Sequence, residues 1–337
     1  MKYCVVLGFG AVGQRCAELI TMKKVFGDRI RIVGVADSSA GVYDVHGVDL
    51  KSILKWKREK KSLRGFKDGY DKSSHVNVRD SEELFEVARK KHLDVVIDLA
   101  PCGNRVTPKI LKSALRNGID CVLANKSPLA TEFYELHNLA RSHNANLAYS
   151  ATICGGLPVA NVASRDLVGS TLESIEGIFN STSNFILSEM RQGRSREDAL
   201  KEAQRRGIAE ADPSLDIQGL DTANKLVILA NTMNIRADMD SVNITGIEKI
   251  QESHIQEAEK RGNVIRLVAS LQRKDNGTYV FSVRPVEVKI NSYLGSCNGT
   301  SMCVQFRTDI FETISMMTDE KGVYPTSAAV LRDILSL

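Results

Sequence analysis

Residues 5–14 read VVLGFGAVGQ, a short apolar run that ends in a Gly-x-Gly-x-x-Gly turn, and a helical pattern follows over residues 11–22. In a strand–turn–helix unit of this kind, the first glycine permits the tight turn, the second lets a pyrophosphate approach the backbone, and the third lets the helix pack on the strand. The stretch therefore predicts a dinucleotide site at the start of the chain. The predicted phosphate loop consists of Gly8, Phe9, Gly10, Ala11, Val12 and Gly13.

Short apolar runs and helical segments alternate over the first 150 residues. The apolar runs are residues 3–7, 31–36, 93–99, 120–123 and 146–149, and the helical segments include 107–117 and 131–143. Runs of this length separated by helices are typical of a parallel sheet that is covered on both faces. We expect an α/β fold with a Rossmann-like, doubly wound parallel sheet, and a dinucleotide-binding domain over residues 1–150.

The pattern changes after residue 150. Helical segments cover residues 158–167, 184–191, 195–206 and 216–232, strand-like segments lie at 172–180, 264–269, 279–283 and 302–306, and a last helix is expected over 326–337. This mixture is typical of an α+β domain built on a mostly antiparallel sheet. We expect such a domain over residues 151–322.

The composition excludes several classes of partner. The 337 residues include 45 Lys and Arg against 41 Asp and Glu, a formal charge of +4, and the two signs are interleaved, which argues against nucleic-acid binding. No stretch reaches the roughly 18–20 apolar residues that span a bilayer, and the first strand begins too early for a signal peptide. The seven cysteines contain no Cys-x-x-Cys pair, so a zinc site is not expected. We expect a cytoplasmic protein with a small-molecule substrate, without membrane or nucleic-acid partners.

Asp37 follows the second predicted strand. An acidic residue at this position accepts hydrogen bonds from the adenosine ribose and repels a 2′-phosphate, which favours NAD over NADP. The polar insertion between residues 37 and 81 leaves NADP open as the alternative, because Lys57 or Arg58 in its basic stretch could neutralise a 2′-phosphate. We expect the insertion to be a solvated surface arm or an addition on the ligand side of the sheet.

Two lysines stand out by their context. Lys126 follows a strand in LANKSPLA (residues 123–130), at the edge where ligands of open α/β sheets bind. Lys225 follows Asp221 by four residues, which puts both on one helix face beside an apolar run, and a partly desolvated lysine can exchange a proton with a substrate oxygen. Glu210, Asp216 and Asp221 could receive an ammonium group. A helix cap with a surface ion pair would explain Asp216 and the Asp221–Lys225 spacing, but not Glu210.

These segments together resemble the homoserine dehydrogenase family, and the resemblance runs along nearly the whole chain. It rests on GFGAVG (8–13), ANKSPLA (124–130), ATICGGLP (151–158), NSTSNFIL (180–187), AEADPSLDIQGLDTANK (209–225) and YPTSAAVLRDI (324–334). The resemblance implies reversible NAD(P)-dependent oxidation of L-homoserine to L-aspartate 4-semialdehyde, in the biosynthesis of threonine and methionine. It also implies a homodimer formed through the second domain, a C-terminal helix 323–337 that returns to the first domain, and a short form without a fused kinase or C-terminal regulatory domain.

The resemblance also assigns roles to residues. Lys225 is similar to the family's proton donor and acceptor at the substrate oxygen, Lys126 to a second, proton-relay lysine, and Asp221 to the carboxylate beside them. The substrate-binding residues that it implies are Glu210, Asp216 and Thr182. The cofactor-binding residues are those of the phosphate loop together with Asp37, Ser38, Ala100, Asn125, Lys126 and Gly322.

Three positions depart from the family pattern. Ser150 stands where the family usually has Glu, before a loop whose carbonyls hold a monovalent cation, here those of Ile153, Gly155 and Leu157. Ser181 replaces a glycine, and residues 319–322 (DEKG) keep one glycine of a richer stretch. These changes leave open a dehydrogenase that acts on another small amino alcohol or aldehyde. A catalytically inactive dinucleotide-binding sensor is the alternative of another class, and the presence of both lysines and their carboxylates argues against it.

Overall fold

The computed structural model describes residues 1–66 and 75–337. These residues form two compact units, one made of Met1–Gly156 with Val323–Leu337 and the other of Leu157–Gly322. The structural division after Gly156 lies a few residues past position 150, where the sequence pattern changes. Among the described residues, no helix is long and apolar enough to cross a membrane.

The first unit contains a seven-stranded sheet in the order β4-β3-β2-β1-β5-β6-β7. Its parallel strands are β1 (Lys2–Leu7), β2 (Ile30–Ala36), β5 (Val95–Asp98), β6 (Asp120–Leu123) and β7 (Leu147–Ala148). Because the chain proceeds outward from β1 in both directions, β1 marks the point where the strand order reverses and where such sheets bind ligands. The predicted doubly wound α/β fold is confirmed.

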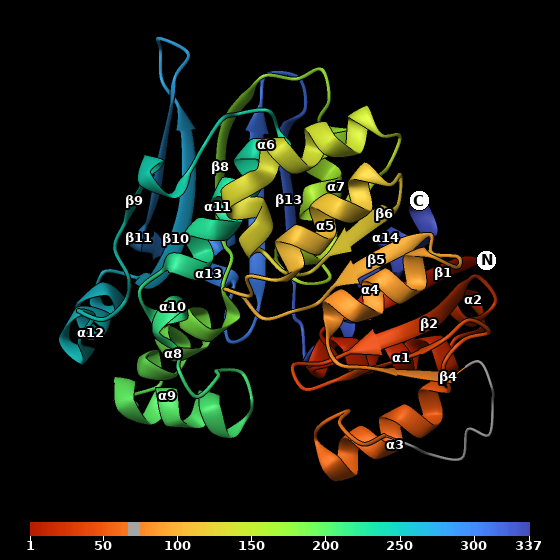
Figure 1. Ribbon diagram of the computed structural model, residues 1–337. Helices are drawn as coiled ribbons and strands as arrows, with labels where there is room; N and C mark the ends of the chain where they lie inside the picture. Colours follow the sequence, from red (N-terminus) through yellow and green to blue (C-terminus); the bar gives the residue numbers. More distant parts are fainter. Residues whose placement is uncertain (67–74) are drawn as a thin grey trace. The chain divides into compact units, whose positions relative to one another are not determined.

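Helices cover both faces of this sheet (Figure 1). The helix α1 (Ala11–Met22) packs against α14 (Tyr324–Ser336), and their apolar side chains share one core cluster with β1 and β2. The hydroxyl of Ser327 in α14 donates to the carbonyl of Val12, which ties α14 to the first turn of α1. Other helices of this unit include α2 (Lys24–Gly27), α4 (Ser81–Arg89), α5 (Thr107–Arg116) and α6 (Ser127–Ser142).

The insertion after Asp37 is more ordered than a solvated arm. It adds the antiparallel strands β3 (Gly41–Asp44) and β4 (His75–Val78) to the edge of the sheet, and the helix α3 (Leu50–Lys60) between them. Ile53 and Leu54 of α3 are buried in the same core cluster as α1. The expectation of a surface arm is therefore wrong for this part, because a narrow apolar stripe at helical spacing lies among the many charges. Residues 67–74 of the insertion lie outside the described residues.

The second unit contains a six-stranded sheet in the order β13-β12-β8-β10-β11-β9. The strands are β8 (Leu172–Ile178), β9 (Val242–Ile244), β10 (Asn263–Arg273), β11 (Tyr279–Lys289), β12 (Met302–Thr308) and β13 (Glu312–Thr318). All neighbours are antiparallel except β9 and β11, so the predicted mostly antiparallel sheet is confirmed.

Helices of the second unit pack on its central strand β10. They include α8 (Ser181–Arg191), α12 (Glu252–Lys260) and α13 (Tyr293–Ser296), with α9 (Arg196–Arg205) against α8. The segment expected to form one helix over 158–167 is instead a short helix α7 (Val159–Asn161) followed by a π-helical turn over Val162–Asp166.

The expected helix over 216–232 is broken into α10 (Ser214–Ile217) and α11 (Leu220–Thr232). Gly219 lies between them in the left-handed region, with φ of +79°. This conformation carries little penalty for glycine and ends a helix. The break turns the chain between Asp216 on α10 and Asp221 on α11, so the two carboxylates are not held at the fixed spacing of one continuous helix.

Candidate active site

The glycine-rich loop leaves room for a phosphate where the sequence predicts one. A Cβ on Gly8 would lie 2.6 Å from the backbone of Leu99, and one on Gly13 would lie 2.7 Å from the carbonyl oxygen of Gly8, so both positions require glycine. A Cβ on Gly10 would meet no atom within 4 Å. Gly10 also immediately precedes α1, whose first N–H groups are suited to an anion. The loop therefore fits the pyrophosphate of a dinucleotide.

Asp37, at the end of β2, is held by protein donors on both carboxylate oxygens. Oδ2 accepts from Lys57 Nζ (2.6 Å) and the main-chain N–H of Leu63 (2.8 Å), and Oδ1 accepts from the N–H and hydroxyl of Ser39 (2.8 and 2.5 Å) and more weakly from the N–H of Ala40 (3.2 Å). Burial alone would raise the pKa of Asp37, but the hydrogen bonds from Lys57 and Ser39 outweigh burial and lower it. The charge expected to repel a 2′-phosphate is thus compensated within the protein, and Ser38 beside it is exposed.

Asp98 was not singled out from the sequence, yet it organises the predicted cofactor residues Ala100 and Asn125. It is buried at the carboxyl end of β5, where Oδ1 accepts from the N–H of Ala100 (3.0 Å) and Oδ2 from Nδ2 of Asn125 (3.0 Å). Burial raises the pKa of Asp98 to about 6. An acidic residue that ends an apolar run, at the edge of the sheet where ligands bind, was the signal that could have identified it.

Lys126 lies at the carboxyl edge of the same sheet, as the residue directly before α6. Its carbonyl accepts hydrogen bonds from the N–H groups of Leu129 and Ala130, which fixes the backbone of this turn. Lys126 belongs to the first unit and Lys225 to the second.

Lys225 sits in a hydrogen-bonded cluster in the second unit. Its Nζ donates to the carbonyl oxygen of Phe179 (2.5 Å) and lies 2.7 Å from Oδ2 of Asp221. The side chains of Lys225 and Asp221 are 12% and 14% exposed, so the pair is shielded from water but still reachable. The contact follows directly from the i, i+4 spacing on α11.

Asn180, which was not among the site residues predicted from the sequence, joins the carboxylates of this cluster. Its Nδ2 donates to Oδ1 of Asp216 (2.6 Å) and to Oδ2 of Asp221 (2.9 Å), and its Oδ1 accepts from the N–H of Ser183 at the start of α8 (2.8 Å). An Asn between a strand and a helix was readable as a helix cap. Its contact with two carboxylates depends on the break at Gly219 and could not be read from the sequence.

Thr182 is hydrogen-bonded to the segment of chain that leads to Glu210. The hydroxyl of Thr182, which is buried in the first turn of α8, donates to the carbonyl of Ile208 (3.0 Å), two residues before Glu210. Glu210 is exposed, and its own carbonyl accepts from Nε2 of Gln204 (3.2 Å). The hydrogen-bonded cluster described above therefore unites Asp216, Asp221 and Lys225 of the predicted site, but not Thr182 or Glu210.

The loop proposed for a monovalent cation follows Ser150, which is paired with an acidic residue of α14. Asp333 accepts from the N–H of Ser150 (2.8 Å) and from its hydroxyl, and burial raises the pKa of Asp333. Cys154 and Gly155 both have positive φ, +54° and +60°. In the part of the chain that is described, no three His, Cys, Asp or Glu side chains group together as a metal site would require.

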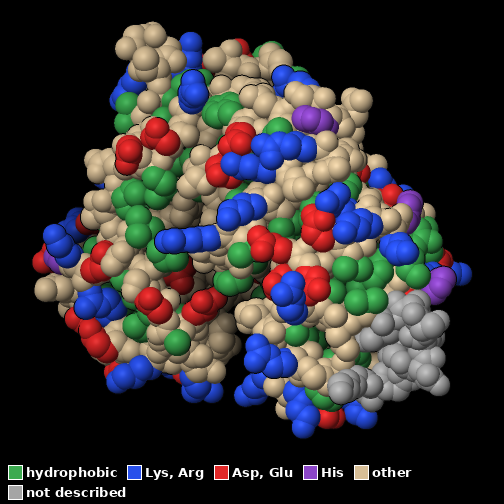
Figure 2. Space-filling view, in the orientation of Figure 1, with side chains coloured by type: hydrophobic (Ala, Val, Ile, Leu, Met, Phe, Trp, Pro, Cys, Tyr) green, Lys and Arg blue, Asp and Glu red, His purple; other side chains and the backbone are tan. Residues whose placement is uncertain are grey.

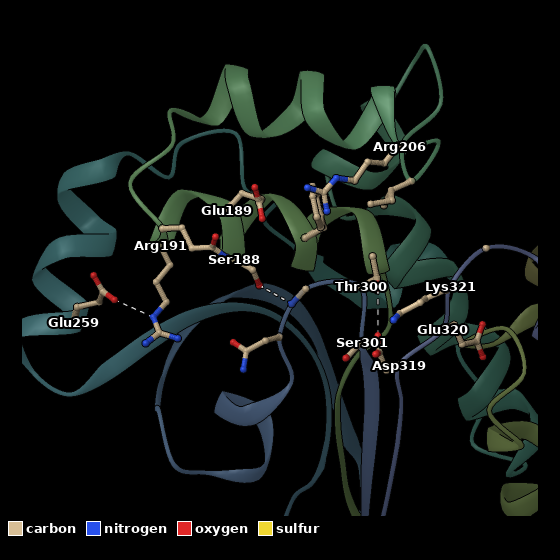
Figure 3. Close-up of a pocket in the computed structure, with 16 residues that line it drawn as sticks. Ser188, Glu189, Arg191, Arg206, Glu259, Thr300, Ser301, Asp319, Glu320 and Lys321 are labelled. Carbon is tan, nitrogen blue, oxygen red and sulfur yellow. Dashed lines mark hydrogen bonds and ion pairs between the residues drawn. The ribbon is translucent and has the colours of Figure 1, made fainter.

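A cavity of about 880 Å³ in the second unit runs along α8 (Figure 3). An Arg191–Glu259 ion pair lies at one end and Glu320 and Lys321 lie at the other. Gly322 and Ile208 also line it, whereas none of the predicted catalytic or substrate-binding residues does. The lining thus holds one predicted cofactor residue, Gly322, and Ile208, whose carbonyl accepts from Thr182. Figure 2 shows acidic and basic side chains interspersed on the face it draws.

Comparisons with known proteins show which family the chain resembles. The family model for Homoserine dehydrogenase matches residues 158–335, and that for Glutamate/Leucine/Phenylalanine/Valine dehydrogenase matches residues 1–131. Homoserine dehydrogenase of Methanocaldococcus jannaschii is 33% identical over 99% of this chain and 97% of its own length. NAD(+)-dependent homoserine dehydrogenase of Pseudomonas canavaninivorans is 29% identical over 98% and 95%. The crystal structure of a putative homoserine dehydrogenase from Archaeoglobus fulgidus superposes with a TM-score of 0.86, at 35% identity, over 100% of this chain and 99% of that one.

The fold and these comparisons define the class: the protein is an NAD(P)-dependent oxidoreductase that acts on a CH–OH group. More narrowly, the chain belongs to the homoserine dehydrogenase family, because the family model covers more than half of it and the likeness to relatives extends along its full length.

Proposed function

We propose that this chain interconverts L-homoserine and L-aspartate 4-semialdehyde, with Lys225 moving the proton at the substrate oxygen. The observation that carries this assignment is the Lys225 cluster. Two of the positions around Nζ face fixed acceptors, the carbonyl of Phe179 and the carboxylate of Asp221. Among the described residues this leaves one position for the substrate oxygen, since an ammonium group has three N–H bonds and an amine has two and a lone pair.

In the oxidative direction, the hydroxyl of homoserine loses its proton to the Lys225 amine as the C–H bond breaks. In the reductive direction the Lys225 ammonium returns that proton to the aldehyde oxygen. Asp221 compensates the charge that Lys225 acquires. We assign Lys126 to a relay role at the same oxygen, and Thr182, Asp216 and Glu210 to holding the amino acid, with the exposed Glu210 facing its ammonium group.

NAD(P) supplies the hydride acceptor when it is bound. We propose that the backbone of Gly8–Gly13 holds its pyrophosphate, that Asn125 and Ala100, fixed by Asp98, line the nicotinamide side, and that Ser38 lies at the adenosine ribose. Because Lys57 compensates Asp37, the preference for NAD expected from an acidic residue at this position is weakened, and both cofactors remain in the proposal.

Three further features belong to the proposal. The second unit exposes apolar side chains at Ile310, Phe311 and Met317, which supports a homodimer through this unit. The interleaved charges support a small-molecule substrate without nucleic-acid partners. A cytoplasmic location is part of the same proposal. A monovalent cation at the carbonyls of Ile153, Gly155 and Leu157 is proposed from the family resemblance.

Homoserine-dependent reduction of NAD⁺ and NADP⁺ by the purified protein tests the function. Other small amino alcohols, offered at the same concentrations, test the alternative substrate that Ser181 and the DEKG segment leave open. We expect kcat/KM for homoserine to exceed that for the other alcohols by at least about tenfold, since one misplaced polar group costs on this order. Turnover of another amino alcohol in preference to homoserine would overturn the assignment.

A further inference from the structure

We propose that Asn180 is a positioning residue that holds Asp216 and Asp221 in place and thereby directs Lys225 at the substrate oxygen. This inference rests on the function proposed above. Asn180 is 4% exposed, and every polar atom of its side chain is engaged within the cluster.

The side-chain amide of Asn180 separates two like charges. Asp216 and Asp221 come from different helices, α10 and α11, and both point at the same nitrogen. Two carboxylates that approach each other repel and favour protonation of one of them. A neutral group with two N–H bonds removes this tendency, because it gives each carboxylate a short charge-assisted hydrogen bond. Asn180 thus holds one carboxylate from each helix, and the one on α11, Asp221, is the ion-pair partner of Lys225.

The orientation of the amide is fixed by the protein. Oδ1 of Asn180 caps α8 by accepting from the N–H of Ser183, so the nitrogen must face the carboxylates. The flipped amide would lose all three hydrogen bonds. The helix cap and the carboxylate bridge therefore use opposite ends of one rigid group.

Asn180 and the residue before it, Phe179, together hold the two groups that contact Lys225. The carbonyl of Phe179 accepts directly from Lys225 Nζ, while the side chain of Asn180 holds Asp221, the ion-pair partner of the same Nζ. Residues 179 and 180 thus fix both groups that orient Lys225. A shift of either would turn the remaining position of Nζ away from the substrate.

Two substitutions separate this role from simple capping. Ser and Asp are both good N-cap residues, so Asn180→Ser and Asn180→Asp keep the acceptor that α8 needs. Serine has one short donor and cannot bridge two carboxylates. Aspartate has no donor when ionised and adds a third negative charge to the cluster. Ser195→Ala is the matched control, because it removes the side-chain cap of α9 in the same unit, where Ser195 Oγ accepts from the N–H of Asp198.

The experiment measures kcat, both KM values, the pH profile of kcat/KM and the melting temperature of the four proteins. We expect Asn180→Ser to lower kcat about 10- to 100-fold while the KM for the cofactor changes less than about twofold. Asn180→Asp should also move the pH at which activity rises upward by about one unit, because added negative charge favours the protonated cluster. Ser195→Ala should lose melting temperature but keep kcat and the pH profile.

Wild-type kcat and pH profile in both Asn180 variants would overturn the proposal. A loss of kcat in Ser195→Ala as large as that in the Asn180 variants, at a comparable loss of melting temperature, would also overturn it. A wild-type protein that does not turn over homoserine would instead contradict the proposed function on which the inference rests, so the two failures are distinguishable in the same set of assays.

Discussion

Lys57 places its ammonium nitrogen 2.6 Å from the carboxylate of Asp37, and the two side chains are only 8% and 9% exposed. The helix α3 carries Lys57 across to the end of β2, where the sheet is expected to meet the adenosine ribose. Lys57 also donates to the carbonyl of Lys61 (3.0 Å), so its position is fixed from both sides. The insertion therefore changes the charge of the predicted cofactor site rather than only enlarging its rim.

Replacing Lys57 by Met should shift the cofactor preference toward NAD. The variant leaves the Asp37 carboxylate without its counter-charge, which repels a 2′-phosphate, so we expect kcat/KM for NADP⁺ to fall about tenfold relative to that for NAD⁺. The variant should also be less stable by about 3 kcal/mol, since a buried charge loses its partner. Steady-state kinetics with both cofactors and urea unfolding check the two expectations.

The double variant Asp37→Asn/Lys57→Met is the control for this prediction. It removes both charges, so much of the stability and of the NADP⁺ rate should return. An unchanged ratio of the two rates in Lys57→Met would show that Asp37 and Lys57 lie away from the 2′-position of the bound cofactor.

The burial of Asp98 predicts a stability that depends on pH. Its pKa is raised to about 6 in the folded protein, so the folded state binds this proton more tightly than the unfolded state does. The free energy of unfolding should therefore fall as pH rises from about 4 to 6, by about 3 kcal/mol from this group. In Asp98→Asn that contribution disappears, so the stability of the variant relative to the wild type should increase as pH rises. The free energy of unfolding of both proteins is measured at pH 4.5 and 7.5. The same difference between the two proteins at both pH values would be inconsistent with a raised pKa of Asp98.

The Ser150–Asp333 pair joins the end of the first sheet to α14. Removing the hydroxyl in Ser150→Ala takes a donor from a buried carboxylate, so we expect a loss of about 1–3 kcal/mol. The loss should be larger at pH 7 than at pH 4, because the hydroxyl stabilises the ionised form of Asp333 against the burial that raises its pKa. Guanidinium unfolding of Ser150→Ala, Asp333→Asn and the double variant checks this. Additive losses from the two single changes would mean that the hydroxyl and the carboxylate do not interact.

Glu210 is the exposed member of the proposed substrate site. If its carboxylate holds the ammonium group of homoserine, Glu210→Gln should raise the KM for homoserine about tenfold and leave kcat within about twofold, because the interaction is the same in substrate and transition state. Glu197→Gln, on the exposed face of α9, is the control. Initial rates measured against homoserine concentration at saturating cofactor give KM and kcat for both variants. A fall in kcat without a change in KM would move Glu210 from substrate binding to the chemical step.

The sheet of the first unit could be predicted because its parallel strands are buried and read as apolar runs. The second, antiparallel sheet was predicted from its mixture of strands and helices. What failed depended on tertiary context. The charges of α3 hid its narrow apolar stripe at Ile53 and Leu54, and the helical pattern over 216–232 gave no weight to Gly219, where the chain turns at positive φ.

The site was predictable where one element sets the geometry. Asp221 and Lys225 lie on one helix, so their spacing implies their contact. Asn180 reaches Asp216 and Asp221 over 36 and 41 residues, and Asp98 reaches Asn125 over 27, and such contacts are set by the fold alone. The ion pair between Lys57 and Asp37 is also a contact that the fold sets. For this reason the acidic residue at the end of β2 suggested a cofactor preference that its surroundings weaken.

The proton transfer by Lys225 is the central claim, and it is tested most directly by homoserine-dependent NAD(P)H formation in the wild type and in Lys225→Met, with cofactor affinity measured on both proteins. We predict that turnover falls by about 10³-fold or more while the Kd for the cofactor stays within about twofold, since Lys225 acts on the substrate oxygen and not on the nucleotide. A Lys225→Met variant that turns over homoserine at the wild-type rate would contradict the account.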